Sequence, residues 1–566
     1  MSGQKKSWQQ RTTIFKWLHA RTYHVIKQAF SELYYDRIAP HLKDFIASNN
    51  FLLWTLATLI GISVGSATLL FRQAIGAVQW TWLGTSHEQI GSLLETTPAY
   101  IFFLAPLIGG VIVGQILHHF VNGNRAHAVA DVIEAKAVKG CHIDLKTGLW
   151  SALIAALSLG FGASAGREGP VVHLGATLAS FITRASEFTH AERRILLAAG
   201  VAAAVSGSFN APIAGVLFAH EVILAHYALR AFVPVVLASV AGTIIVRLTI
   251  GEFPAFLIPE YAISSYWEFP AFALLGLATA LVAILFQLSL STSERIAWSF
   301  TMPIWLRPII GGALVGSIAV FYPEVLGVGY DTTDNALKQN LALHVLIALL
   351  IAKVIATSIT LASRFGGGIF SPSLYLGACT GGAFGILAAS LFPETASSNG
   401  LYAILGMGGV AAAVLGAPIS TTMIVFELTG GYEMTIALLV TVSISTALSQ
   451  AVLGMSFFHW QLSRRGLFLA AGPHKQIATT LTVKNFYKAS ETPTPLEPDE
   501  DGKIPPTLRL TDNIETALRQ FNKTGQNQLS VIIDKADDQI IGTAHKIDAL
   551  NAYNQALIKA HEEEHR

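Results

Sequence analysis

Cysteine and charged side chains are both scarce in this sequence. The two cysteines, Cys141 and Cys379, are far apart and have no histidine cluster beside them, which argues against a disulfide framework and against a zinc site. Charged residues form 13% of the 566 residues and hydrophobic residues form 52%, a balance outside the range of soluble proteins. A membrane protein is therefore expected. The net charge of +1 gives no reason to expect a nucleic-acid partner.

Signal-peptide and enzyme patterns are also missing. The first fifty residues contain no short apolar core followed by small residues, so no cleavable signal peptide is expected. No nucleophile, base and orienting group form a recognisable set, and no metal-ligand spacing occurs. We therefore expect a protein that is not an enzyme and that has no cofactor.

The sequence does contain a long series of apolar stretches. Residues 51–82 and 100–120 are long enough to cross a bilayer. Several others are too short to cross it upright: 150–161, 171–182, 195–205 and 213–224. Backbone polar groups that end inside a bilayer must be buried in protein or face water, so these runs predict tilted and re-entrant helices. The further stretches are 231–250, 269–290, 309–320, 343–361, 369–391, 401–415, 419–428 and 436–453. The predicted fold class is an all-α, multi-pass membrane protein.

Basic residues mark both ends of the apolar region. Residues 1–50 predict an amphipathic helix on the cytoplasmic surface, because basic side chains are interspersed there with aromatic and aliphatic ones. The basic side chains are Lys5, Lys6, Arg11, Lys16, Arg21, Lys27, Arg37 and Lys43. Arg464 and Arg465 follow the last apolar stretch. Both termini are therefore expected in the cytoplasm, at a bacterial inner membrane or a plasma membrane.

The C-terminal region has a different character. Residues 491–506 are rich in proline and acidic residues and predict a linker. Strands are expected at 507–510, 530–534 and 539–542, and helices at 513–524 and from Lys546 onward. These elements predict a small α/β module at 507–566, which follows a membrane domain at 51–466 and a connecting region at 467–506.

A motif at residues 166–170 returns at residues 368–372. The first reads Gly-Arg-Glu-Gly-Pro, the second reads Gly-Ile-Phe-Ser-Pro, and each opens an apolar helix. The pairs at one constant offset are Gly166 and Gly368, Pro170 and Pro372, Leu174 and Leu376, Gly175 and Gly377, and Ala176 and Ala378. Val-Ala-Ala-Ala-Val likewise occurs at 201–205 and again at 410–414. The chain therefore has two related halves, about 51–250 and 268–466, whose broken helices predict a transport site.

Arg167 and Glu168 put two charges at a helix start inside an apolar region. Each charge costs about 2.5 to 3.5 kcal/mol to insert into a membrane. Such residues are usually retained for a site or an ion pathway, and we prefer this interpretation for Glu168. The alternative is that the two charges only pair with each other.

The motifs at 166–170 and 368–372, with Gly-Ser-Phe-Asn-Ala-Pro at 207–212 between them, resemble those of the ClC family of chloride channels and proton-coupled chloride transporters. The resemblance runs from about residue 50 to the end of the chain. It implies a homodimer in the lipid bilayer, with two inverted halves and one pore per subunit for chloride or a similar small anion. The tail resembles a single CBS motif, which begins near 482–486 and resumes at Thr507.

The resemblance also assigns roles at the two helix starts. Helix N-termini carry free N–H groups and a partial positive charge, so they can bind an anion without trapping it. The backbone N–H groups of Ile369 and Phe370 would contact the anion. Glu168 would be the gate, with its carboxylate in the outer anion site. The other residues expected at the anion are Gly166, Arg167, Gly169 and Gly368. Core packing is the alternative for Phe370.

Three positions depart from the family pattern. His127 stands where a serine usually binds the central anion, and it would either donate an N–H group or cap a loop. Phe458 replaces a tyrosine, so it lacks that hydroxyl donor and would either narrow the inner mouth or pack in the core. Val222 replaces an inner glutamate that relays protons, whereas the adjacent Glu221 would cap a helix or pair at the inner surface. A gated, passive chloride channel is therefore favoured over a proton-coupled exchanger.

Two alternatives stay open. A proton-coupled antiporter would exchange protons for chloride, and a membrane sensor acting through the tail would transport neither. CBS motifs ordinarily work in pairs, so the two tails of a dimer are expected to pair. Asp548 matches an aspartate that meets a ribose, but His545 stands where a hydroxyl residue is usual. Binding of an adenine nucleotide therefore competes with a purely structural role for the tail.

Overall fold

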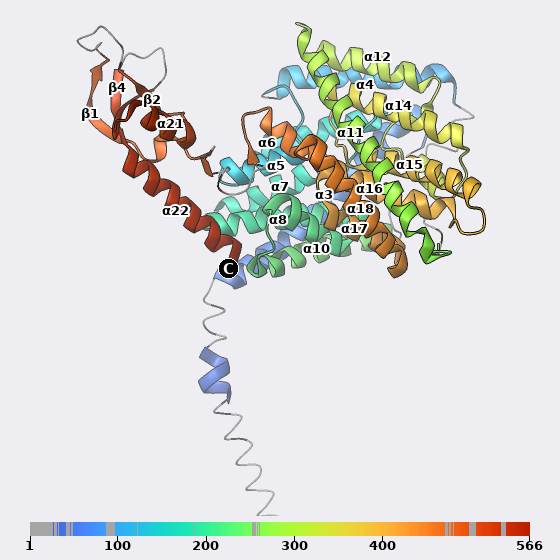
Figure 1. The fold of residues 1–566 in the computed structure, drawn as a ribbon, viewed down its shortest axis with the longest axis horizontal. Coiled ribbons are helices and arrows are strands. Elements are labelled where there is room, and N and C mark those ends of the chain that lie inside the picture. The colour runs from blue at the N-terminus through green and yellow to red at the C-terminus, as the bar shows by residue number, and fades with distance from the viewer. Residues whose placement is uncertain are drawn as a thin grey trace, which may run out of the picture. The chain divides into compact units, whose positions relative to one another are not determined.

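Figure 1 shows the computed structural model of the chain. It describes residues 49–85, 97–121, 123–185, 187–251, 261–469, 480–496, 505–533 and 539–565, with scattered positions elsewhere. Residues 1–56 and residues 57–566 form two separate units. Most of the amphipathic segment predicted at 1–50 lies outside the described residues, and within it Leu33–Ile38 (η1) forms a short π-helix.

The first half of the membrane domain is a series of long and short helices. They are α3 (Asn49–Leu83), α4 (Ala99–Phe120), α5 (Val129–Val138), α6 (Leu145–Gly160), α7 (Glu168–Ile182), the 3₁₀ turn η3 (Thr183–Ala185), α8 (His190–Phe209), α9 (Pro212–Phe218), the π-helix η4 (Ala219–Leu224) and α10 (Leu229–Ile250). Local sequence sets the boundaries. Asn210 ends α8 in a left-handed conformation with φ of 58°, and Pro212 occupies the first turn of α9, where its missing N–H group costs nothing.

The second half follows the same plan. Its elements are the 3₁₀ turn η5 (Tyr266–Glu268), α11 (Phe269–Ser299), α12 (Leu306–Ala319), the 3₁₀ turn η6 (Pro323–Val325), α13 (Tyr330–Leu337), α14 (Leu343–Ala362), α15 (Phe370–Leu391), α16 (Asn399–Leu415), α17 (Pro418–Thr429), α18 (Tyr432–Leu453) and α19 (Phe457–Ser463). Seven helical segments of the described chain are long and apolar enough to cross a membrane, and four shorter apolar helices accompany them. The chain is an integral, multi-pass membrane protein.

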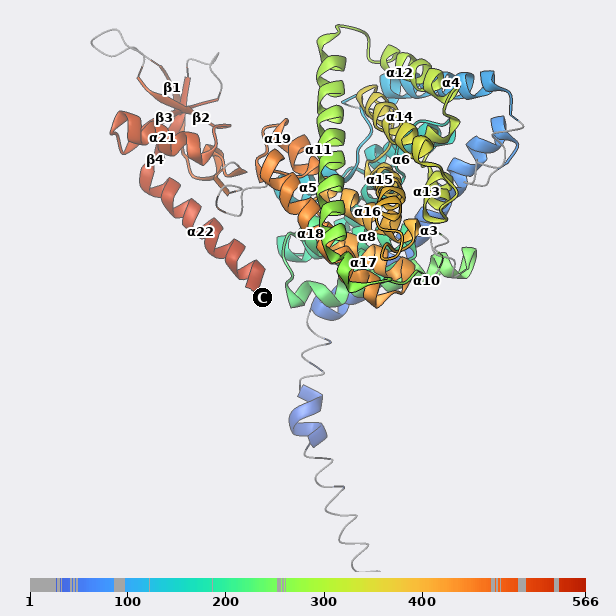
Figure 2. The same ribbon diagram turned by 45° about the vertical axis from the view of Figure 1, so that its right-hand side comes forward.

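Corresponding helices of the two halves pack in the same way. Helix α8 packs against α7 and α10, and its counterpart α16 packs against α15 and α18. Helices α4, α12 and α14 lie together at one end of the helical domain (Figure 2). Glycines permit the closest crossing, between α15 and α16, where Gly377 and Gly381 face Gly406 and the backbone of Tyr402. The predicted fold of two related halves with broken helices is confirmed.

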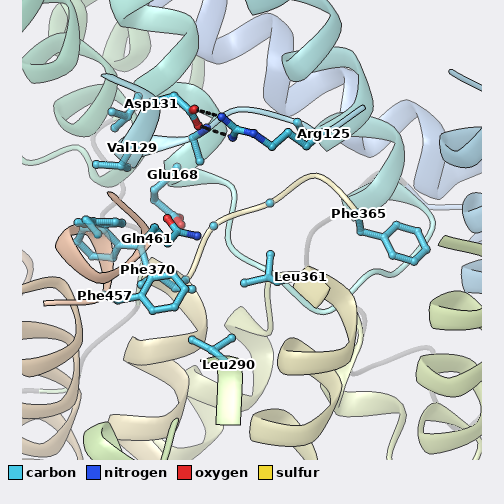
Figure 3. Close-up of a pocket in the computed structure, with 18 of the residues that line it drawn as sticks. Arg125, Val129, Asp131, Glu168, Leu290, Leu361, Phe365, Phe370, Phe457 and Gln461 are labelled. Carbon is cyan, nitrogen blue, oxygen red and sulfur yellow. Dashed lines mark hydrogen bonds and ion pairs between the residues drawn. The ribbon is translucent and has the colours of Figure 1, made fainter. Parts of the chain in front are cut away.

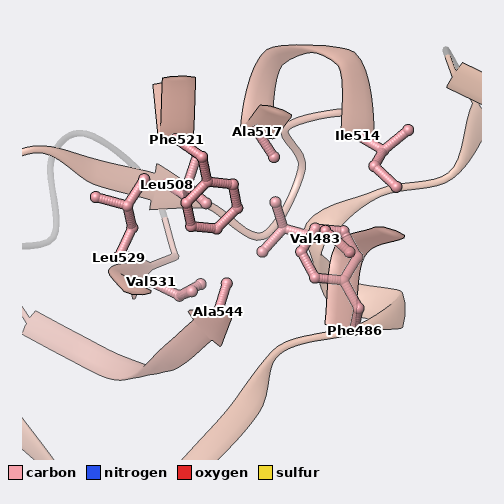
Figure 4. Packing of buried hydrophobic residues seen from close by; sticks show 10 residues of the cluster. Val483, Phe486, Leu508, Ile514, Ala517, Phe521, Leu529, Val531 and Ala544 are labelled. Atoms are coloured by element: carbon pink, nitrogen blue, oxygen red, sulfur yellow. The ribbon is translucent and has the colours of Figure 1, made fainter. Parts of the chain in front are cut away.

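The tail forms the predicted α/β module. Its elements are the 3₁₀ turn η8 (Val483–Asn485), β1 (Lys488–Pro495), β2 (Thr507–Arg509), α21 (Ile514–Thr524), β3 (Gln528–Ile532), β4 (Gln539–His545) and α22 (Lys546–His565). The strand order is β1-β4-β3-β2; β2 and β3 are parallel, and the other two pairs are antiparallel. Figure 4 shows its core, in which Phe486 and Phe521 pack with Val483 and Val531.

The prediction of a linker at 491–506 was wrong for residues 491–495. Strand β1 extends through Pro495 and pairs with β4. Its prolines, Pro493 and Pro495, suit the position, because an edge strand leaves one side of its backbone unpaired and tolerates a missing N–H group.

Candidate anion site

The starts of α7 and α15 lie against each other. The N–H group of Gly166 donates to the carbonyl oxygen of Gly368, and the N–H group of Gly368 donates to the carbonyl oxygen of Gly166, both at 2.7 Å. A Cβ atom on Gly368 would lie 3.1 Å from the nitrogen of Gly169, so a side chain at this position would press against the backbone of the other helix start. The two motifs that the sequence repeat relates therefore meet at one point.

Glu168 lies at this junction and is 1% exposed. Its Oε1 atom accepts a hydrogen bond from the Tyr330 hydroxyl at 2.9 Å, and its Oε2 atom accepts one from the Ser371 hydroxyl at 2.6 Å. The Nε atom of Arg167 is 3.8 Å from Oε1, and its guanidinium group lies 4.9 Å from the centre of the Tyr330 ring. The carboxylate is therefore held by two hydroxyl donors as well as by the neighbouring arginine.

A cavity of about 140 Å³ opens beside Glu168. Figure 3 shows the Glu168 side chain near Gln461 and Phe370, with the Arg125–Asp131 pair further along the same cavity. Six of the residues expected at the gate and the anion line it: Glu168, Gly169, Gly368, Ile369, Phe370 and Phe458. Three others, Gly166, Arg167 and His127, lie outside the lining.

Phe370 packs in the core and also borders the cavity. It lines the cavity, and its ring centre lies 4.9 Å from that of Phe209 and 6.0 Å from that of Phe218. Core packing therefore fixes the first residue of α15, while the same residue borders the cavity. Phe458 is 5% exposed and also borders the cavity.

His127 makes its contacts elsewhere. Its backbone N–H group donates to the Ser151 hydroxyl at 3.2 Å, its Nδ1 atom is 3.8 Å from Oδ1 of Asp131, and its ring centre is 5.3 Å from that of His173. Burial lowers the pKa of the His127 imidazole below 6.5, although Asp131 raises it. A histidine with a lowered pKa is neutral at pH 7, so His127 brings no positive charge to this region.

Three arginines that were not predicted as site residues also line the cavity: Arg125, Arg364 and Arg465. The Arg125 guanidinium forms two hydrogen bonds with Asp131. Arg465 bonds to Asp131 at 2.9 Å and to Glu134 at 2.7 Å. The sequence predicts a topological role for Arg465 but not a site role, since arginines in short polar segments follow no periodic pattern.

Two contacts of Glu168 were also missed. Ser371 belongs to the repeated motif, where it aligns with Gly169, so a comparison of the two motifs could have suggested it as a donor. Tyr330 begins the short polar helix α13, and nothing in the sequence around it points to a partner 162 positions earlier.

Glu221 and Glu427 each cap a helix of the other half. The Glu221 carboxylate accepts hydrogen bonds from the N–H groups of Ile419 at 3.0 Å and Ser420 at 2.7 Å, at the start of α17. Glu427 accepts them from the first N–H groups of α9, at 3.0 and 2.7 Å. Of the two roles expected for Glu221, capping of a helix or pairing at the inner surface, the hydrogen bonds correspond to the first. Val222 is 8% exposed and has no titratable group.

The described residues offer no evident place for a resident metal ion. No three His, Cys, Asp or Glu side chains of that part of the chain are grouped closely enough to bind one. Cys141 and Cys379 are both buried free thiols.

Comparison with known proteins agrees with the fold. Residues 109–450 match the model of a family described as voltage gated chloride channels. A ClcB-like chloride channel protein of Ralstonia nicotianae is 31% identical over 389 residues, which are 68% of this chain and 90% of that protein. The H⁺/Cl⁻ exchange transporter ClcA of Vibrio cholerae is 28% identical over 424 residues, with coverage of 73% and 89%. This chain belongs to the voltage gated chloride channel family.

Solved structures share the architecture. A slow cyanobacterial Cl⁻/H⁺ antiporter superposes with a TM-score of 0.65 at 22% identity, over 73% of this chain and 97% of that one. A eukaryotic CLC transporter gives 0.64 at 17% identity, over 88% and 99%. At these identities, the likeness concerns the fold alone.

Proposed function

We propose that this protein carries chloride or a similar small anion across a membrane through the cavity beside Glu168, with that carboxylate as the gate and without obligatory proton coupling. The position of Glu168 is the observation that supports this most directly. The carboxylate is buried at the junction of two helix starts, borders the cavity and accepts hydrogen bonds from Tyr330 and Ser371. The named relatives include a chloride channel protein and a chloride exchanger, which supports an anion as the cargo.

The gate works by competition for the same donors. A hydroxyl or N–H group that holds a carboxylate can hold a halide instead, so Glu168 and the transported anion exclude each other at Ser371 and at the start of α15. Protonation removes the charge of the carboxylate, and an incoming anion displaces it. Either event frees the donors. The partial charge of a helix start binds an anion moderately, so the anion can leave again and conduction continues.

Passive transport is favoured because the expected inner proton carrier is missing. Val222 cannot titrate, and both carboxylate oxygens of Glu221 are occupied by N–H groups of α17. Exchange is the second candidate, since the relative from Vibrio cholerae is named as an H⁺/Cl⁻ exchange transporter.

Purified protein in liposomes, with a chloride electrode and a pH electrode recording together, tests the proposal. We expect an imposed chloride gradient to run down without uphill movement of protons. Val222→Glu should keep the chloride flux of the wild type. Because it introduces a carboxyl group at this position, it is the variant expected to gain coupled proton movement. Uphill proton movement by the wild type would establish exchange. If neither ion moves, the transport proposal fails and the sensor becomes the better explanation.

For the tail, we propose that two copies pair in a homodimer on the cytoplasmic side and serve mainly a structural role. Asp548 is already bonded to Lys488 at 2.9 Å, and His545 offers no hydroxyl group to a nucleotide. Calorimetric titration of the full-length protein with ATP and AMP should therefore give no heat at millimolar ligand. A saturable heat that Asp548→Ala abolishes would instead establish a nucleotide site.

A further inference from the structure

The loop between α14 and α15 brings Arg364 to the cavity beside Glu168. The backbone of Arg364 is left-handed, with φ of 71°, and its N–H group donates to the carbonyl oxygen of Leu361. The next residue, Phe365, is 4% exposed and anchors the loop in an apolar cluster with Val113 and Leu117. A left-handed non-glycine residue is unusual, so the surrounding packing holds Arg364 in this place.

Arg364 differs from the other two arginines of the cavity. Arg125 and Arg465 are bound directly to the carboxylates of Asp131 and Glu134. The Arg364 guanidinium lies over the indole ring of Trp298, 5.0 Å from its centre. Within the described part of the chain, it forms no ion pair with a carboxylate. Its charge is therefore less neutralised by direct partners than that of the other two.

Apart from the arginines, Gln461 and the start of α15, the lining offers few hydrogen-bond donors to an anion. Five of its members are phenylalanines: Phe218, Phe365, Phe370, Phe457 and Phe458. Among the described residues that line the cavity there is no serine, threonine or tyrosine. Glu294, which lines the cavity together with Asp131 and Glu168, adds negative charge near Arg364. An anion that enters this space therefore leaves water for a wall in which five phenylalanine rings lie beside acidic side chains, which is unfavourable unless a fixed positive charge is near.

We propose that Arg364 is a binding and selectivity residue of the cavity: its guanidinium attracts small monovalent inorganic anions and replaces, by charge, the hydroxyl donors that Phe458 and the displaced His127 do not supply. The proposal deepens the transport function above and depends on it. The Arg364 side chain is half-buried and its guanidinium lies over the Trp298 indole ring, which keeps it in position. The negative charge of Glu294 repels an anion and so prevents binding that is too tight.

Changing the charge of the side chain at position 364, by substitution and chemical modification, tests this proposal in the full-length protein. The only native cysteines are buried, so a thiol introduced by Arg364→Cys can be modified selectively with methanethiosulfonate reagents. At low ionic strength we expect Arg364→Cys to lower chloride flux in liposomes about three- to ten-fold, because a half-buried fixed charge is weakly screened. A reagent that adds an ammonium group should restore the flux, and one that adds a sulfonate should lower it further. The differences should shrink at about 1 M salt, where the screening length falls to about 3 Å.

Arg307 provides a matched control. Its guanidinium lies over the same Trp298 ring, 5.5 Å from the centre, but it is not among the residues that line the cavity. Arg307→Cys should keep the wild-type flux with every reagent. Arg364→Asn is a second neutral variant for the case in which the cysteine variant folds poorly, because asparagine tolerates a left-handed backbone.

The outcomes separate the two proposals. If the wild type carries chloride and Arg364→Cys behaves like Arg307→Cys, with modification verified by mass spectrometry, the role of Arg364 is overturned. The same conclusion follows if ammonium and sulfonate reagents have equal effects. If the wild type carries no anion, the transport function itself fails.

Discussion

Glu168→Gln is expected to raise anion flux at neutral pH about 10- to 100-fold and to abolish its increase on acidification. The amide keeps the shape of the side chain but loses the charge that holds the hydroxyl groups of Tyr330 and Ser371. A hydrogen bond to a charged group contributes about 1.5 to 3 kcal/mol. Loss of that free energy lowers the fraction of time that the side chain occupies the anion site by about 10- to 100-fold. Chloride efflux from liposomes at neutral and acidic pH measures both effects.

Glu294→Gln is the matched control, since Glu294 lines the same cavity but is not the carboxylate to which Tyr330 and Ser371 donate. It should leave the increase of flux on acidification intact, because Tyr330 and Ser371 still donate to Glu168. If Glu168→Gln conducts and responds to pH as the wild type does, Glu168 is not the gate. Ser371→Ala should have an intermediate effect, because it removes one of the two donors.

Gly381→Val is expected to prevent the membrane domain from folding. A Cβ atom at position 381 would overlap with the carbonyl oxygen of Tyr402, which is backbone and cannot turn aside. Helix α15 would have to separate from α16, and the first residues of α15 border the cavity. Overpacking of this kind costs about 1 to 3 kcal/mol when side chains can adjust and more when backbones collide. Size-exclusion chromatography of the detergent-solubilised protein should show aggregate in place of a single folded species.

The adjacent glycine supplies the control. A Cβ atom at Gly382 would lie 3.3 Å from a terminal methyl group of Leu346, which can move aside. Gly382→Ala should therefore yield folded protein with a melting temperature close to that of the wild type. A normal elution profile and normal chloride flux for Gly381→Val would show that the two helices are not held by this contact.

The sequence predicts the scaffold and the junction well, for a physical reason. Helix length, glycine and proline boundaries and the internal repeat are local features, so the meeting of 166–170 with 368–372 can be anticipated. Tyr330 and Arg364 could not be predicted in the same way. Their positions depend on how short loops dock against distant helices, and a left-handed arginine such as Arg364 leaves no pattern in the sequence. The same limit explains the error at 491–506, where pairing with β4 overrides a composition typical of a linker.

The exchange of caps between Glu221 and Glu427 has a consequence for biogenesis. The acceptor of the first N–H groups of α9 lies 214 positions further along the chain, at Glu427. Until the ribosome has added Glu427, the first N–H groups of α9 lack this acceptor. During that time the first half is in the bilayer or is shielded by the insertion machinery. The second half therefore supplies the hydrogen-bond acceptor that the first half lacks. Two halves expressed from separate genes would have to associate before these helix caps could form.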